Sequence, residues 1–127
     1  MGIIKGYISK LNSLKMTEKT YTASLLISHS PRKTRLIINP IRSKNLEEAL
    51  LILKAMNKPK AKRISALLIS AASNLKLSEG DYSSYRLNHI VAEETGIMYR
   101  MMPRGKGSSA KFRRRQARVK VLLSAGK

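Results

Sequence analysis

The chain has 127 residues and a formal net charge of +19, from 26 Lys and Arg against 7 Asp and Glu, and it contains no cysteine. This length allows one domain with a modest core, and the absence of cysteine excludes disulfides, thiolate nucleophiles and thiolate metal sites. Such an excess of positive charge makes a chain repel itself unless an anion neutralises it, so a polyanion is the first partner to expect. No apolar run is long enough for a membrane span or a signal peptide, and we therefore expect an unexported protein with no membrane partner.

The first part of the chain predicts a basic extension, a strand and a short helix. Residues 1–19 fit no element and form the extension, and the apolar, β-forming segment 21–27 predicts the strand. Ser30 is a suitable N-cap and Pro31 suits the first helical position, so a helix should begin there. Pro40 cannot continue that helix, which should kink or end near Asn39. Its basic residues are expected along one edge: Arg32, Arg35 and Arg42.

Two further helices and a second strand follow. Asn45 with Glu48 resembles a capping box and predicts a helix over about 46–56. After the break at Pro59, apolar residues at three- and four-residue spacing between 61 and 75 predict a third helix that packs against the domain's own sheet. The segment SEGDYSS predicts a polar turn. The strand after it should place alternate residues on one face: Tyr85, Leu87, His89 and Val91.

The C-terminal third predicts a β-hairpin that leaves the body. Alternate residues 117, 119, 121 and 123 are apolar, but that face becomes arginine at 113 and 115, so the strand should leave the core around Gln116. The segment 96–102 can pair back across the turn residues of 103–109. Arms of about 12 residues would reach roughly 40 Å, more than the roughly 30 Å diameter expected for the body.

These elements predict an α+β fold: three helices packed on a small antiparallel sheet, with a long extended β-hairpin. The expected boundaries are 1–19 for the extension, 20–95 for the body, 96–123 for the hairpin with its tip at about 103–110, and 124–127 for a tail. An isolated hairpin carrying Arg113, Arg114 and Arg115 needs a partner, and structured RNA would supply phosphates and bases to the guanidinium groups. The alternative is a disordered basic arm that binds any nucleic acid.

Several segments resemble one protein family over nearly the whole chain from about residue 21. SPRKTRLIINPIRSK followed by LEEALLIL, and AEETGIMYRMMPRGKGSSAKFRRRQARVKVLL, are similar to segments of the universal large-subunit ribosomal protein twenty-two family, in its bacterial and organellar form. The resemblance implies an α+β fold whose hairpin threads large-subunit rRNA and places its tip in the wall of the nascent-peptide exit tunnel. It implies a structural role in binding rRNA, in subunit assembly and in lining the tunnel.

Site residues follow from the matched motifs and the basic hairpin. The residues expected to bind rRNA are Arg32, Lys33, Arg35, Arg42, Lys44, Arg100, Arg104, Lys106, Lys111, Arg113, Arg114, Arg115, Arg118 and Lys120. Those expected at the tunnel tip are Met101, Met102, Pro103, Arg104, Gly105, Lys106, Gly107, Ser108 and Ser109. The chain departs from the family pattern at Pro40, at Ser108 and Ser109, and over 116–118.

The expected partners are large-subunit rRNA of the 23S type, neighbouring large-subunit proteins and, transiently, the nascent polypeptide. The expected location is the cytoplasmic ribosome of a bacterium, or a plastid or mitochondrial ribosome. A free basic module that binds DNA is the alternative, because the segments 31–42 and 46–56 could mimic a helix-turn-helix. The basic residues, however, concentrate on the hairpin and not on one recognition helix.

Catalysis, metals, cofactors and small-molecule substrates are not expected. The acids occur as the adjacent pairs 47–48 and 93–94, which point in different directions and make poor acid and base partners. Gly105-Lys106-Gly107 lacks the spacing of a phosphate-binding loop. His29 and His89 stand apart from any second ligand at metal-binding spacing.

Overall fold

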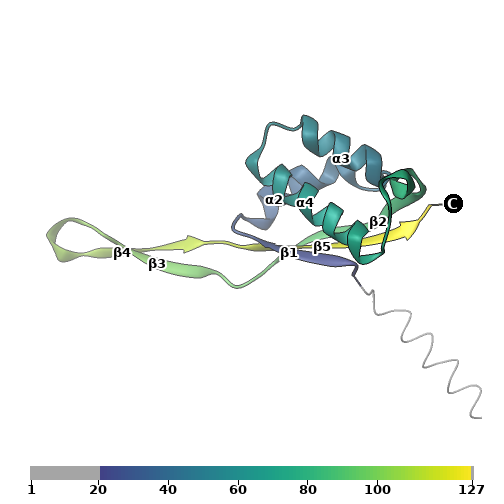
Figure 1. The fold of residues 1–127 in the computed structure, drawn as a ribbon. Coiled ribbons are helices and arrows are strands. Elements are labelled where there is room, and N and C mark those ends of the chain that lie inside the picture. Colours follow the sequence, from purple (N-terminus) through teal and green to yellow (C-terminus); the bar gives the residue numbers. More distant parts are fainter. Residues whose placement is uncertain (1–20, 127) are drawn as a thin grey trace, which may run out of the picture.

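The computed structural model describes residues 21–126, so the predicted extension 1–19 lies outside the described residues. Within these residues, three α-helices and two antiparallel sheets form an α+β fold, which confirms the predicted class (Figure 1). The helices are α2 (Pro31–Ile38), α3 (Leu46–Ala55) and α4 (Pro59–Asn74). The body strands are β1 (Ala23–Ile27), β2 (Tyr85–Glu94) and β5 (Ala117–Ala125), and the hairpin strands are β3 (Met98–Pro103) and β4 (Ser109–Arg114).

The body sheet has the order β1-β5-β2, and both neighbours of β5 run antiparallel to it. Figure 1 shows the helices on one side of this sheet. The core lies between the two layers, where Val119 and Val121 of β5 meet Leu68 of α4 and Ile38 of α2, all fully buried. Strand β5 is therefore the central strand, and the apolar alternation predicted for 117–123 faces the helices.

The predicted alternation of β2 is wrong because the strand contains a bulge. Leu87 pairs with Leu123 and His89 pairs with Leu122, so Asn88 is the extra residue. A bulge inserts one residue into the ladder and shifts the side chains beyond it to the other face. As a result Leu87, Ile90 and Ala92 are buried, whereas the predicted set had continued through residues 89 and 91.

Helix α2 begins as its sequence predicts. The Ser30 hydroxyl accepts a hydrogen bond from the Lys33 N–H at 3.4 Å, and Pro31 occupies the first turn. The helix ends at Ile38 and continues as the 3-10 turn η1 (Asn39–Ile41), which accommodates Pro40 in its first turn and confirms the early end. Because Arg42 follows η1 in extended conformation, its predicted place on the basic edge of the helix is wrong.

The two longer helices agree with the prediction except at one cap. Asn45 is the N-cap residue of α3, but its side chain makes no capping hydrogen bond, so the expected capping box is absent there. A capping box forms instead at Ser78 and Asp81, where the 3-10 turn η2 (Glu79–Ser84) begins. Helix α4 buries its apolar face as predicted, and its buried residues are Ala61, Ile64, Leu67, Leu68, Ala71 and Ala72.

The hairpin is a separate two-stranded sheet that projects from the body (Figure 1). Its ladder runs from the pair Met98 and Arg114 to the pair Pro103 and Ser109, six residues in each strand. The six paired residues of each strand span roughly 20 Å. The linking residues 95–97 and 115–116 and the turn at 104–108 lengthen the projection beyond this ladder, and 117–125 belong to the body sheet. None of the helices in residues 21–126 is both long enough and apolar enough to cross a membrane.

Candidate nucleic-acid interface

In the part of the hairpin ladder nearer the body, each basic residue lies opposite an apolar or aromatic residue. Residues directly opposite each other on an antiparallel pair point to the same side, with their Cβ atoms about 5 Å apart. Each side of the hairpin therefore offers cations and apolar surface together. The four successive cross-strand pairs are Met98 with Arg114, Tyr99 with Arg113, Arg100 with Phe112, and Met101 with Lys111.

Large apolar side chains on β3 are exposed to solvent. Tyr99 is 60% exposed and Met101 58%, and Met98 and Met102 are about half exposed. The Arg114 guanidinium lies 5.9 Å from the centre of the Phe112 ring. Exposed apolar side chains gathered on one strand favour an interaction surface there. Sequence reasoning missed Tyr99 and Phe112 as candidate site residues, and the strand register is the signal that places them beside the arginines.

The hairpin tip is closed by its own backbone and by Ser108. The Arg104 N–H donates to the Ser108 carbonyl oxygen at 2.8 Å, and the Ser108 hydroxyl donates to the Gly105 carbonyl oxygen at 2.9 Å. Lys106 and Gly107 adopt left-handed backbone conformations with φ of 59° and 73°. Only glycine adopts this conformation freely. Ser108, one of the departures from the family pattern, thus has a local role in the turn.

A basic hollow lies at the base of the hairpin, where it meets the start of α2. It has a volume of about 460 Å³, and its cations come from three places: Lys33 on α2, Arg100 on β3, and residues 113–115. Ser28, His29 and Ser30 of the β1–α2 connection, together with Met98 and Gln116, complete the lining. No acid lines this hollow. A second hollow shares Ser30 and Arg115 with it and is completed by Pro31, Arg32, Arg35 and the acid Glu94.

Within residues 21–126, three of the predicted cations make a side-chain hydrogen bond or ion pair with another part of the protein. The Arg35 guanidinium donates to the Ala92 carbonyl oxygen at 3.1 Å, which ties α2 to β2. Arg115 lies 3.3 Å from the Glu94 carboxylate. Lys120 lies 2.7 Å from a Glu93 oxygen and 5.2 Å from the centre of the Tyr21 ring. These side chains therefore stabilise the body as well as contributing positive charge.

Arg42 and Lys44 lie at the opposite end of the body sheet from the hairpin. The Lys44 carbonyl oxygen accepts a hydrogen bond from the Leu87 N–H at 3.0 Å, near the start of β2. The hairpin joins the sheet at the other end, where Glu94 pairs with Ala117. Since the residues between these points span roughly 20 Å of strand, the predicted cations do not form one patch.

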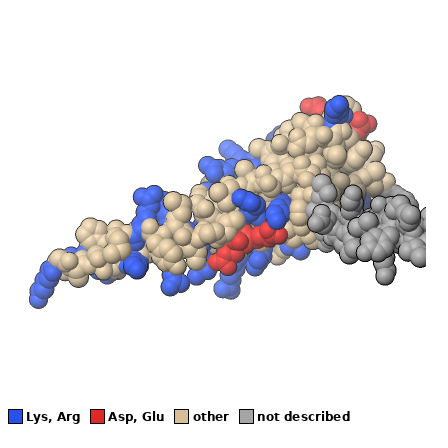
Figure 2. Space-filling view, turned by 90° about the horizontal axis from the view of Figure 1, so that it is seen from below, with Lys and Arg blue, Asp and Glu red and all other residues tan. Residues whose placement is uncertain are grey.

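Charge is distributed unevenly along the molecule. Figure 2 shows Lys and Arg along the whole hairpin, with acidic side chains at the hairpin base and at the far end of the body. No acid follows Glu94 in the sequence. Within residues 21–126, no three His, Asp or Glu side chains gather as a metal site would require. A small α+β body with a projecting, acid-free, basic and aromatic hairpin is typical of proteins that bind polyanions.

Comparisons with known proteins identify the family. The model of the family "Ribosomal protein L22p/L17e" matches residues 23–124. The chain is 34% identical over 99 residues to the large ribosomal subunit protein uL22 of Pelobacter propionicus, covering 77% of this chain and 89% of that protein. It is 33% identical to the proteins of the same name from Blochmanniella pennsylvanica, covering 84% and 98%, and from Geobacter metallireducens, covering 75% and 87%. The chain therefore belongs to the ribosomal protein L22p/L17e family, whose members are structural ribosomal proteins and not enzymes.

Proposed function

We propose that this protein is a structural constituent of the large ribosomal subunit that binds large-subunit rRNA with its hairpin and with the start of α2. The relatives named above are large-subunit proteins. The observation that carries the proposal is the run of four cross-strand pairs on the hairpin, each joining a cation to Met, Tyr or Phe. RNA presents phosphates and unstacked bases side by side, and this surface is complementary to both.

The hairpin residues divide the work of binding between charge and stacking. The guanidinium groups of Arg100, Arg113 and Arg114 neutralise phosphates and release counterions, which makes affinity dependent on salt. Tyr99 and Phe112 stack on bases, and this contribution depends little on salt. Because a two-stranded hairpin alone is marginally stable in water, rRNA also holds the hairpin in place.

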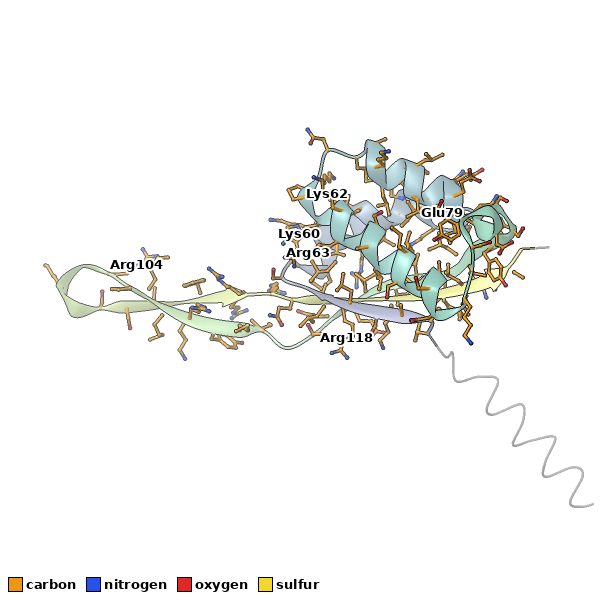
Figure 3. All side chains as sticks on the ribbon, viewed as in Figure 1. Lys60, Lys62, Arg63, Glu79, Arg104 and Arg118 are labelled. Carbon is orange, nitrogen blue, oxygen red and sulfur yellow. The ribbon has the colours of Figure 1, made fainter. Side chains whose placement is uncertain are left out.

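The tip is assigned a different task, in the wall of the nascent-peptide exit tunnel. Residues 104–108 form a compact turn beyond the paired strands, and every side chain from Met101 to Ser109 is exposed. Figure 3 shows Arg104 at this end of the molecule, far from the body. A tip that makes no contact with its own body is free to line a channel through which the nascent polypeptide passes.

The partners proposed are 23S-type rRNA, neighbouring large-subunit proteins and, transiently, the nascent chain. The three relatives come from bacteria, which supports a ribosome in bacterial cytoplasm; a plastid or mitochondrial ribosome is the other host that the family resemblance implies. The body contributes the rigid support, since α2 is tied to β2 through Arg35 and to the core through Ile37 and Ile38.

Sedimentation tests this function directly. A tagged copy is expressed in a cell whose ribosomal subunits are then separated on a sucrose gradient at high salt, and the protein is quantified in each fraction. We expect one copy for each large subunit. Protein that stays at the top of the gradient, or that sediments with DNA, would contradict the ribosomal role and support a free nucleic-acid-binding module.

A further inference from the structure

A second basic surface lies on the body, at residues outside the set expected to bind rRNA. Helix α4 begins after Lys58 and carries Lys60, Lys62 and Arg63 in its first turns, with no acid in the first turn and no side-chain cap. Figure 3 shows these labelled side chains at the end of α4 nearer the hairpin. The helix dipole makes cations unfavourable at this end. Their presence there destabilises the free protein unless an external anion lies nearby.

Part of this surface borders a hollow between α2 and the start of α4. The hollow has a volume of about 420 Å³. Leu36 and Pro59 line it together with the buried Ile37. Leu36, on α2, is 60% exposed. The remaining lining residues are His29, Lys33, Lys58 and Lys60, and no acid is among them. The hollow therefore combines an apolar floor with a cationic rim.

The rim cations Lys33 and Lys60 act on the neighbouring His29. The pKa of the His29 imidazole lies below its ordinary value because of desolvation by burial first, and then because of the charges of Lys33 and Lys60. His29 and Lys33 also line the hollow at the hairpin base. The positively charged surface is consequently continuous from the hairpin, across the start of α2, to the start of α4.

We propose that the hollow between α2 and α4 binds one unpaired nucleotide of RNA, with its base against Leu36 and Pro59 and its flanking phosphates at Lys33, Lys58 and Lys60. An exposed apolar side chain gains little from a fully stacked duplex, whose bases are covered, but it can pack against the face of a base that has left the stack. The phosphates on either side explain why the rim contains lysines and no acid. The inference rests on the proposed function, since it assumes that the chain binds RNA.

The absence of cysteine allows a clean test. Leu36→Cys places a thiol in the hollow, and Leu51→Cys places one on α3, where Leu51 is 62% exposed and lines none of the three basic hollows. Each full-length variant is alkylated with iodoacetamide, alone and with a transcript of large-subunit rRNA. With RNA at about ten times its Kd, an occupied hollow should slow alkylation of the Leu36→Cys thiol about tenfold. Alkylation of the Leu51→Cys thiol should not change.

The outcomes separate the two proposals. If the transcript binds both variants but does not slow alkylation of the Leu36→Cys thiol, the nucleotide site is wrong while the proposed function stands. Protection of the Leu36→Cys thiol in whole large subunits but not by RNA alone would assign the hollow to a neighbouring protein and also overturn the site. If neither variant binds the transcript, the proposed function fails.

A charge variant provides a second readout. Lys60→Gln at the start of α4 should reduce the slope of log affinity against log salt by up to about one unit, because one phosphate contact is lost. Lys76→Gln, just beyond the end of the same helix and equal in charge change, should leave the slope unchanged. Equal slopes for the two variants would contradict a phosphate contact at Lys60.

Discussion

Arg100 and Phe112 lie directly opposite each other across the β3–β4 ladder, and Tyr99 and Arg113 form the next pair toward the body. The cation is on β3 in one pair and on β4 in the other. Since neighbouring pairs point to opposite sides of the hairpin, both sides carry a cation beside an aromatic ring. Both sides of the hairpin are therefore suited to the proposed contacts with rRNA.

The pair Tyr99 and Arg113 allows charge and stacking to be measured separately. Tyr99→Ala should lower affinity for rRNA about 5- to 150-fold without changing its salt dependence, because one stacked base is worth about 1–3 kcal/mol. Arg113→Gln should instead reduce the salt slope by about one unit. Titrations of a labelled rRNA transcript at several salt concentrations measure both quantities. A loss of salt slope in Tyr99→Ala would contradict the division.

Glu94 limits how much of Arg115 is available to RNA. The Arg115 guanidinium and the Glu94 carboxylate are 3.3 Å apart, and both side chains are about half exposed. The pair therefore adds no more than about 0.5 kcal/mol to the folding stability. Glu94→Gln should leave urea unfolding almost unchanged and strengthen RNA binding, because the guanidinium loses a competing carboxylate. Glu79→Gln makes the same change in net charge at an exposed position in η2. Equal gains in affinity for both variants would mean that only net charge matters.

The body should be stable without RNA because it has its own core. Leu68 of α4 is fully buried between the helices and the sheet. Leu68→Ala should reduce the free energy of unfolding by about 2–5 kcal/mol, whereas Leu51→Ala, at an exposed site, should change it by no more than about 0.5 kcal/mol. Urea titration followed by circular dichroism measures both. Similar small losses for the two variants would show that the body is not closely packed in the free protein.

His29 should make both stability and RNA binding depend on pH. Its folded-state pKa lies below the unfolded value of about 6.5, so the folded state binds fewer protons just below that pH. The contribution of His29 to folding stability is therefore complete above about pH 6.5, and it is lost as the pH falls through the folded-state pKa. Bound phosphates would raise the pKa again, and RNA affinity should then increase as the pH falls. An NMR titration with and without RNA, assigned with His29→Asn, measures the shift; an unchanged pKa on binding would contradict phosphates near His29.

Local signals in the sequence were sufficient for much of the fold. Ser30 and Pro31 predict the start of α2, Pro40 predicts its end, and the spacing of apolar residues predicts α4, because each signal acts within one or two turns of the chain. Asn45 shows the limit of such signals: it has the right residue type and backbone conformation for a capping box, yet its side chain makes no capping bond. The capping motif alone does not determine which hydrogen bonds form.

Long-range geometry could not be read from the sequence. The bulge at Asn88 depends on the register against β5 and reverses the face of everything after it. The pairing of Arg100 with Phe112 likewise needs the hairpin register. The hollow between α2 and α4 joins residues 29–37 to residues 58–60, which only packing brings together. Charge and motifs therefore predict the class of partner, whereas the arrangement of contacts requires the fold.

The tip and the base of the hairpin should have separable functions. Replacing residues 105–109 alone should leave incorporation into large subunits nearly normal, because this turn lines none of the three basic hollows, but should alter nascent-chain stalling or the response to macrolide-type antibiotics. Replacing Arg113, Arg114 and Arg115 together should reduce incorporation and lower the salt slope of rRNA binding by up to about three units. Competition with the unaltered protein during subunit assembly, followed by sucrose-gradient quantification, compares the two. Equal losses of incorporation would show that the tip is as necessary for assembly as the base, and would contradict a tip that serves the tunnel alone.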